Sequence, residues 1–248
     1  MKRAKNLTST VYDTILEMMM NSRIIPGERL KFEQLAEKIG VSRTPVNNAL
    51  HILAREGYLD FIPNRGYTVS RLTIEEMEYL LEVRTILEIG TISKSIRRIT
   101  DEKLAAVEKA MSAYEYLAAE PDCHAWFILD AEFHSAIIAM TENHYLVEQY
   151  LQICRKIFLN FRPCAIRPGG IAREHRALFE SIRIRDVESA KDLIKRHAVT
   201  FQRAVFLLSP LHPLQGSKRI HDEMDLKNWV DIGMRRDISK DMMASHSM

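Results

Sequence analysis

Four polar side chains stand at positions where the surrounding sequence is apolar. Asp130 and His134 are four residues apart, so both project from one face of a helix. His175 and His197 each lie in an apolar stripe of a later helix. A buried carboxylate or imidazole must be paired or bound to a metal, because bare burial costs several kcal/mol. Three imidazoles and one carboxylate from three helices therefore predict a divalent cation site, for zinc or alternatively nickel, with coordination positions left open.

Arg84 is a further charged residue in an apolar stripe, between Leu80 and Leu87. One explanation is a local ion pair with Glu88, one helical turn later. In the other, the planar guanidinium faces a cavity and binds a carboxylate. Combined with a cation that keeps open positions, the second explanation predicts a receptor for a small organic acid, with Arg84 as the effector-binding residue.

A second group of polar residues begins a predicted helix near the N-terminus. Ser42, Arg43 and Thr44 place two hydroxyls, a guanidinium and free helix-terminal amides at its first turn. These groups hold phosphates and reach base edges when a helix tip enters the major groove. Asn47, one turn later, carries the amide that pairs with adenine in two-point contacts. Each residue also has a purely structural explanation, such as a cap or a solvated charge, but their order together favours DNA binding.

The elements that must position this second group are a helix-turn-helix and a hairpin. Helical and strand patterns are predicted over residues 8–22, 32–39, 42–56, 58–62 and 67–69. Gly40 follows the second helix, where a left-handed residue ends helices at low cost. Arg65 and Gly66 lie in the turn between the strands, and Gly66 allows close approach to a nucleic-acid backbone. A helix-turn-helix followed by a β-hairpin wing is a winged helix.

The metal-binding group requires a different architecture. From residue 73 the sequence is helical with short interruptions, over 73–98, 101–119, 122–140, 143–161, 171–184 and 187–208. Asn143 is expected to be the N-cap of the fourth of these. The predicted fold is mainly α, with an antiparallel bundle of six or seven helices behind the winged helix. The expected domains are 1–72 for DNA binding, 73–209 for effector binding and dimerisation, and a tail over 210–248, disordered or with a short helix over 224–234.

Composition limits the class of protein. The 248 residues are 46% hydrophobic and 27% charged, which is typical of a globular protein. No segment has the length or apolar character of a membrane span or a signal peptide, so we expect a cytoplasmic protein with no membrane partner. Cys123, Cys154 and Cys164 form no disulfide or zinc pattern. The first seventy residues carry ten Lys and Arg against seven Asp and Glu, a weak basic excess where DNA would bind.

The segment 32–46, the apolar positions that follow it and the wing over 64–69 together resemble the GntR family of regulators. The helical half resembles the FCD ligand-binding domain of the FadR-like branch. The resemblance implies a cytoplasmic homodimer on a palindromic operator, and it matches the family's metal ligands to Asp130, His134, His175 and His197. The resemblance also favours the second explanation for Arg84, in which its guanidinium binds the effector. The chain departs from the family at Asn47 and Asn48, where many relatives carry Arg-Glu, and at Glu33, where some carry a basic residue.

These observations predict a DNA-binding transcriptional repressor, not an enzyme, whose operator affinity responds to a small organic acid at a metal-containing pocket. A metal-dependent hydrolase is one alternative, with Glu132 or Glu174 as the base. Another is a DNA-binding protein whose bundle serves only dimerisation. The remaining histidines show no partner spacing and are expected on the surface or in loops: His51, His124, His144, His212, His221 and His246.

Overall fold

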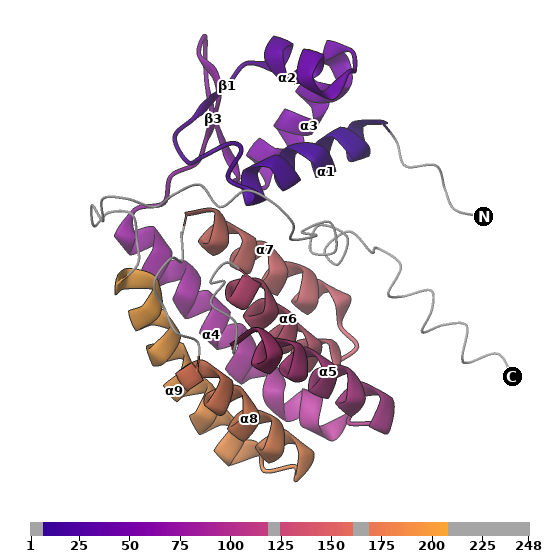
Figure 1. Ribbon diagram of the computed structural model, residues 1–248, viewed down its shortest axis with the longest axis vertical. Coiled ribbons are helices and arrows are strands. Elements are labelled where there is room, and N and C mark those ends of the chain that lie inside the picture. The colour runs from indigo at the N-terminus through magenta and orange to yellow at the C-terminus, as the bar shows by residue number, and fades with distance from the viewer. Residues whose placement is uncertain (1–6, 119–124, 161–168, 208–248) are drawn as a thin grey trace, which may run out of the picture. The chain divides into compact units, whose positions relative to one another are not determined.

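The computed structural model describes residues 7–118, 125–160 and 169–207 (Figure 1). The described residues fall into two compact units, one ending at Thr73 and the other beginning at Ile74. The predicted tail over 210–248, its short helix, and Cys123 and Cys164 lie outside the described residues. The chain is mainly helical with one small sheet, so the predicted fold class is confirmed.

The first unit is a helix-turn-helix with a wing. Its elements are α1 (Leu7–Met20), β1 (Arg29–Leu30), α2 (Phe32–Ile39), α3 (Arg43–Arg55), β2 (Leu59–Ile62) and β3 (Gly66–Val69). Gly40 ends α2 with a φ of 76°, and the next amide, of Val41, donates to the carbonyl of Ala36. Val46 and Leu50 are fully buried on the inner face of α3, which packs on α1 and α2. The outer face of α3 is thereby left exposed.

The wing has one strand more than the sequence predicts. The sheet is antiparallel with strand order β1-β3-β2, so β3 lies in the centre. Leu30 of β1 and Phe61 of β2 both pair with Tyr67 of β3. β1 has only two residues, too few to show the alternation by which strands are recognised, and it is held by its pairing with β3. A hairpin alone was therefore an incomplete prediction.

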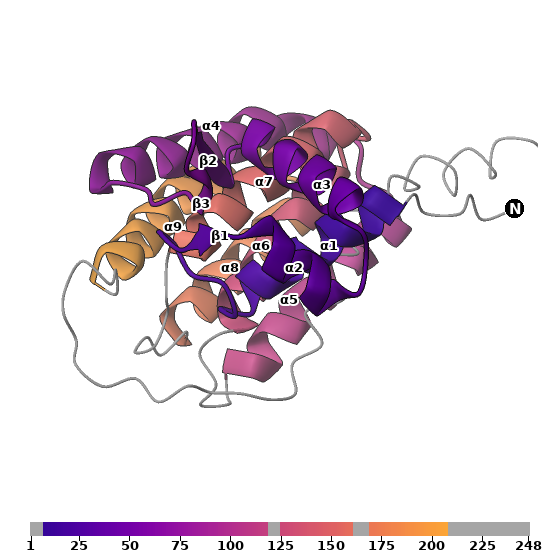
Figure 2. The same cartoon turned by 90° about the horizontal axis from the view of Figure 1, so that it is seen from above.

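The second unit is the predicted helical bundle. Its helices are α4 (Ile74–Arg97), α5 (Asp101–Ala118), α6 (Ala125–Ala139), α7 (His144–Asn160), α8 (Gly169–Arg183) and α9 (Val187–Leu207). α9 packs against both α4 and α8, and α5 packs against α6 (Figures 1 and 2). Asn143 is the N-cap of α7, because its Oδ1 accepts the amide of Tyr145 at 3.1 Å.

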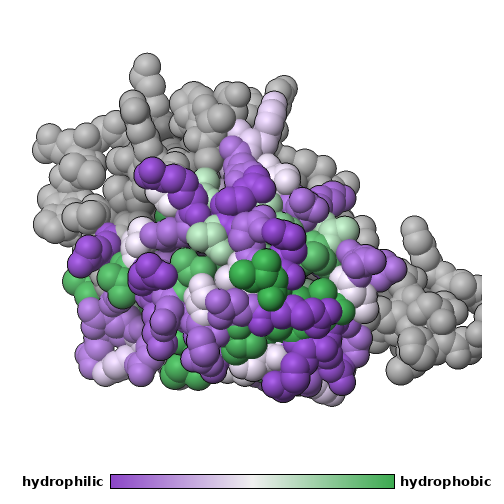
Figure 3. Space-filling model, turned by 90° about the horizontal axis from the view of Figure 1, so that it is seen from below, coloured by the Kyte–Doolittle hydropathy of each residue, from purple (hydrophilic) through white to green (hydrophobic). Residues whose placement is uncertain are grey.

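The bundle has an apolar core and a mixed surface. Ile92, Val107, Phe133, Ile137 and Ile182 are among its buried core residues. On the face in Figure 3, hydrophobic side chains form separate patches among hydrophilic ones. No helix within the described ranges is long and apolar enough to cross a membrane. Against this apolar background, the few buried charged groups stand out.

Replacement by alanine at two glycines should change the free energy of unfolding in opposite directions. Gly40→Ala should destabilise the first unit by about 1 kcal/mol, because alanine must adopt a left-handed conformation although no atom crowds its Cβ. Gly90→Ala, in the open middle of α4, should stabilise the second unit by about 0.5–1 kcal/mol. Urea titrations followed by circular dichroism measure both changes. A Gly40→Ala variant as stable as the parent would contradict the first assignment.

Candidate metal centre and nucleic-acid interface

The bundle brings together the four predicted metal ligands. Asp130 and His134 come from α6, His175 from α8 and His197 from α9. All four are buried, with 0–2% of their surface exposed. One ligand atom from each lies within 4.8 Å of every other. Three helices therefore present one carboxylate and three imidazoles to a single point.

The distances within this group are those of a shared ligand sphere. Asp130 Oδ1 lies 3.2 Å from His175 Nε2, 3.3 Å from His197 Nε2 and 4.0 Å from His134 Nε2. Donor atoms around one tetrahedral zinc ion, at about 2.1 Å from it, lie about 3.4 Å apart. These four buried atoms have no hydrogen-bond partner in the described part of the chain. Because buried polar atoms are rarely left without a partner, the set fits a cation.

Arg84 crosses from α4 and neutralises the second oxygen of the carboxylate. Its Nη2 donates to Asp130 Oδ2 at 2.7 Å, and its Nε donates to Glu88 Oε1 at 2.8 Å. The guanidinium is 3% exposed and stacks 4.1 Å from the centroid of the Phe201 ring. The local pair with Glu88 thus exists, buried rather than exposed. Nη1 is the guanidinium nitrogen that lacks a hydrogen-bond partner among the described residues, so Arg84 has no free pair of nitrogens with which to bind an effector carboxylate.

Two carboxylates contact the imidazoles on the side away from Asp130, through the Nδ1 atoms. Neither contact could be predicted from the sequence. Glu174 Oε2 lies 3.0 Å from His197 Nδ1, and Thr200 donates to the other oxygen of Glu174 at 2.8 Å. Glu88 Oε2 lies 3.6 Å from His134 Nδ1, and Tyr150 donates to Glu88 Oε1. Carboxylates in this position orient metal-bound imidazoles. Glu174, considered above as a base, is engaged with His197.

The surrounding charges and burial shift the pKa values of the four candidate ligands, and for three of them the shift favours the protonation state that binds a cation. Burial raises the pKa of Asp130, but Arg84 and the imidazoles outweigh it and hold that pKa well below its usual range. Burial lowers the pKa of His175 to about 4 and, with the charge of His197, the pKa of His134 well below its usual value. Burial also lowers the pKa of His197, yet the neighbouring carboxylates of Asp130 and Glu174 raise it to about 9. A carboxylate and two neutral imidazoles are thus in their coordinating forms.

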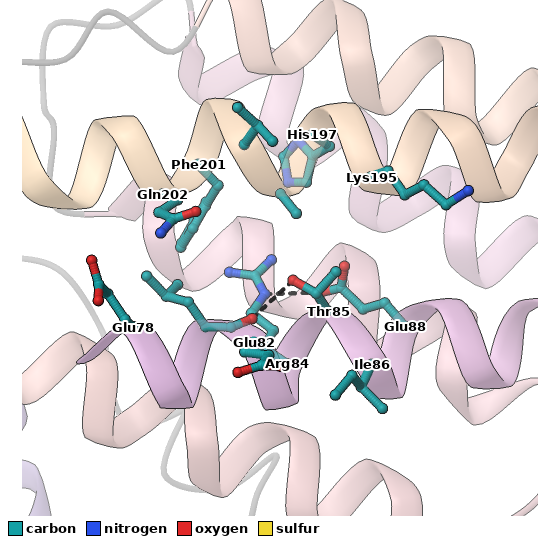
Figure 4. A pocket seen from close by; sticks show the side chains of 13 residues that line it. Glu78, Glu82, Arg84, Thr85, Ile86, Glu88, Lys195, His197, Phe201 and Gln202 are labelled. Carbon is teal, nitrogen blue, oxygen red and sulfur yellow. Dashed lines mark hydrogen bonds and ion pairs between the residues drawn. The ribbon is translucent and has the colours of Figure 1, made fainter. Parts of the chain in front are cut away.

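A cavity of about 330 Å³ lies between α4 and α9, and of the four candidate ligands His197 lines it. Figure 4 shows Arg84 and Glu88 of α4 facing His197 and Phe201 of α9 across it. Its further lining mixes aliphatic and charged side chains: Glu78, Leu81, Glu82, Thr85, Ile86, Lys195, Ala198, Val199 and Gln202. The volume lies at the small end of ligand pockets, which usually span about 300–1,000 Å³.

The predicted DNA-binding residues lie in the first unit. Ser42 is the N-cap of α3 without a side-chain capping bond, so its hydroxyl is not used by the helix. Arg43, Thr44 and Asn47 are exposed on α3, and the Arg43 guanidinium lies 6.0 Å from the Phe32 ring.

At the tip of the wing, Arg65 is exposed and Gly66 has a φ of 81°. The structure is thus compatible with all six predicted DNA contacts, whose role stays a prediction.

Two family models match the chain. Residues 7–69 match bacterial regulatory proteins of the gntR family, and residues 79–200 match the FCD domain. The HTH-type transcriptional regulator YdhC of Bacillus subtilis is 28% identical over 193 residues, which cover 75% of this chain and 85% of YdhC. The HTH-type transcriptional repressor GlaR of Escherichia coli is 25% identical and covers 71% of this chain and 84% of GlaR.

Solved structures agree on the fold. The E. coli McbR/YncC structure has a TM-score of 0.70 at 20% identity and covers 82% of this chain and 98% of its own. A GntR transcriptional regulator from Rhodococcus sp. has a TM-score of 0.69 at 20% identity, covering 80% and 97%. With both family models matched in order along one chain, the protein belongs to the GntR family of transcriptional regulators and carries a C-terminal FCD effector-binding domain.

Proposed function

We propose that this protein is a transcriptional repressor whose affinity for its operator is set by a small organic acid bound at a divalent cation in the FCD domain. The observation that carries the proposal is the convergence of four buried ligand atoms that have no hydrogen-bond partner among the described residues, next to a cavity that His197 lines. Repression is supported by the relative GlaR, which is itself a repressor. The regulator proposed here is not an enzyme.

Asp130, His134, His175 and His197 would hold the cation. Zinc is the first choice, because imidazole and carboxylate ligands suit it, and nickel is the alternative. When bound, the cation supplies a positive charge and coordination positions for an anionic ligand. Arg84 holds Asp130 in place through Oδ2, so that Oδ1 faces the imidazoles.

The effector is proposed to be a small carboxylate. Its negative charge would face the cation and Nη1 of Arg84, the guanidinium nitrogen without a partner among the described residues. Its remaining atoms would lie in the cavity beside Phe201 and Leu81. Binding changes operator affinity only if the acid prefers one arrangement of the protein, with a coupling of typically about 1–3 kcal/mol.

Double-stranded DNA is the proposed partner of the first unit, with Ser42, Arg43, Thr44, Asn47, Arg65 and Gly66 in contact with it. GntR regulators usually act as dimers, and a two-fold dimer reads a palindromic operator. An exposed apolar stripe on α4, formed by Tyr79, Val83 and Ile86, supports self-association of this chain. The exposed amide of Asn47 supports base reading in place of the arginine common in relatives.

Removal of the cation should abolish effector control. Operators selected from a random duplex library are titrated with zinc-loaded protein in the presence of acetate, lactate, pyruvate, succinate or citrate. At least one acid should change the dissociation constant by about 5–150-fold. The change should vanish after chelation and in Asp130→Asn and His175→Ala, which should bind no zinc, but persist in the surface control His144→Ala. An effect of the acid on operator affinity that survives chelation would contradict a metal-dependent pocket. If the protein binds neither zinc nor any of the acids, the bundle has a purely structural role.

Removal of the Glu174 carboxylate, which contacts His197 but is not itself a proposed metal ligand, should weaken zinc binding. Glu174→Ala should reduce zinc affinity about 10- to 100-fold, because His197 loses the partner that orients its ring. Competition with a chromophoric chelator measures the affinity, and the exposed Glu188→Ala on α9 serves as the control. Equal affinity of both variants would show that Glu174 does not position His197.

Asn47→Ala should remove the preference for adenine at one operator position. A two-point amide contact with adenine contributes about 1–3 kcal/mol of discrimination against other bases. Binding-site selection with both proteins, followed by affinity measurements on single-base variants, tests this. An unchanged base preference would remove Asn47 from the residues that read sequence.

A further inference from the structure

His51 extends the exposed face of α3 beyond the predicted DNA contacts. Arg43, Asn47 and His51 are spaced by four residues each, and all three are exposed. In an α-helix this spacing places them in a row along one face. Nothing in the sequence singled out His51, because its partner lies in a strand 16 residues away.

The imidazole is held by the wing. His51 Nδ1 lies 2.8 Å from the hydroxyl of Tyr67, and the two rings meet edge to face with centroids 5.5 Å apart. Tyr67 is 4% exposed and lies in the central strand β3, so it is a fixed anchor. The ring of Phe61 from β2 is also close, with its centroid 6.4 Å from that of His51. His51 therefore sits at the seam between α3 and the wing, which is defined here by these three rings.

The hydrogen bond to Tyr67 leaves Nε2 for a ligand outside the protein. If the ring is neutral with its proton on Nε2, the Tyr67 hydroxyl donates to Nδ1. If the ring is protonated, Nδ1 donates to the Tyr67 oxygen instead. In both forms Nε2 offers an N–H donor, and an anion facing it selects these forms over the remaining tautomer.

We propose that His51 binds a phosphate of the DNA backbone at this seam, with Tyr67 as its positioning residue. The inference rests on the proposed DNA binding of the first unit. The tip of α3 fits the wide major groove, and the narrow Gly66 turn fits the adjoining minor groove. Adjoining grooves are separated by one sugar–phosphate strand, so that strand must cross between α3 and the wing. The Nε2–H group of His51, which lies at this seam, would donate a hydrogen bond to a phosphate of that strand.

The test compares full-chain variants on two duplexes. Operators selected by the parent protein and scrambled versions of them are titrated with His51→Ala, His51→Gln, Tyr67→Phe and a control in the second unit, His144→Ala. His51→Ala should weaken binding about five- to tenfold on both duplexes, with the base preference unchanged, because a phosphate contact carries no sequence information. Gln, which keeps an N–H donor of similar reach, should restore part of the affinity, and Tyr67→Phe should lose part of it.

A phosphate scan then locates the contact. Neutral methylphosphonates are placed one at a time along the operator, and one substitution should weaken the parent but cause no further loss in His51→Ala. Equal affinity of His51→Ala and parent, loss confined to particular bases, or additive losses at every phosphate would each overturn the inference. A parent protein that binds no duplex would instead remove the proposed function, and the inference with it.

Discussion

The interior of the bundle depends on one carboxylate without exposed surface, that of Asp130. An unpaired charge in such a place is strongly destabilising, so each of its oxygens needs a partner. Arg84 forms an ion pair with Oδ2, but the same guanidinium also pairs with a second buried carboxylate, that of Glu88. Two carboxylates and one arginine leave a deficit of one positive charge. A proton on His197, whose pKa is raised to about 9, or a cation among the imidazoles supplies it.

This charge balance ties the helices to one another. Asp130 of α6 faces Arg84 of α4, His175 of α8 and His197 of α9, so four helices meet at one side chain. Each contact is buried and short, and loss of a single partner exposes the others to an uncompensated charge. The packing of the helices is therefore sensitive to the charge at this point. The proposed carboxylate effector, placed beside Arg84, would act on the same balance.

Local pattern was sufficient for part of this structure. Apolar stripes located His175 and His197, the four-residue spacing placed Asp130 and His134 on one helix face, and the family resemblance joined the four into one set. Local pattern cannot identify that partner when it is distant in sequence. Glu174 behind His197, and Tyr67 beside His51, depend on how separate elements pack, and the two-residue strand β1 depends on β3. The free nitrogens of Arg84 likewise could not be counted before Asp130 was known to take one.

Connectivity then limits how the two units can influence each other. β3 ends at Val69 and α4 begins at Ile74, so residues 70–73 alone join the strand that anchors His51 to the helix that carries Arg84. If the proposed effector shifts α4 through Arg84, these four residues are the covalent route by which the shift would reach β3.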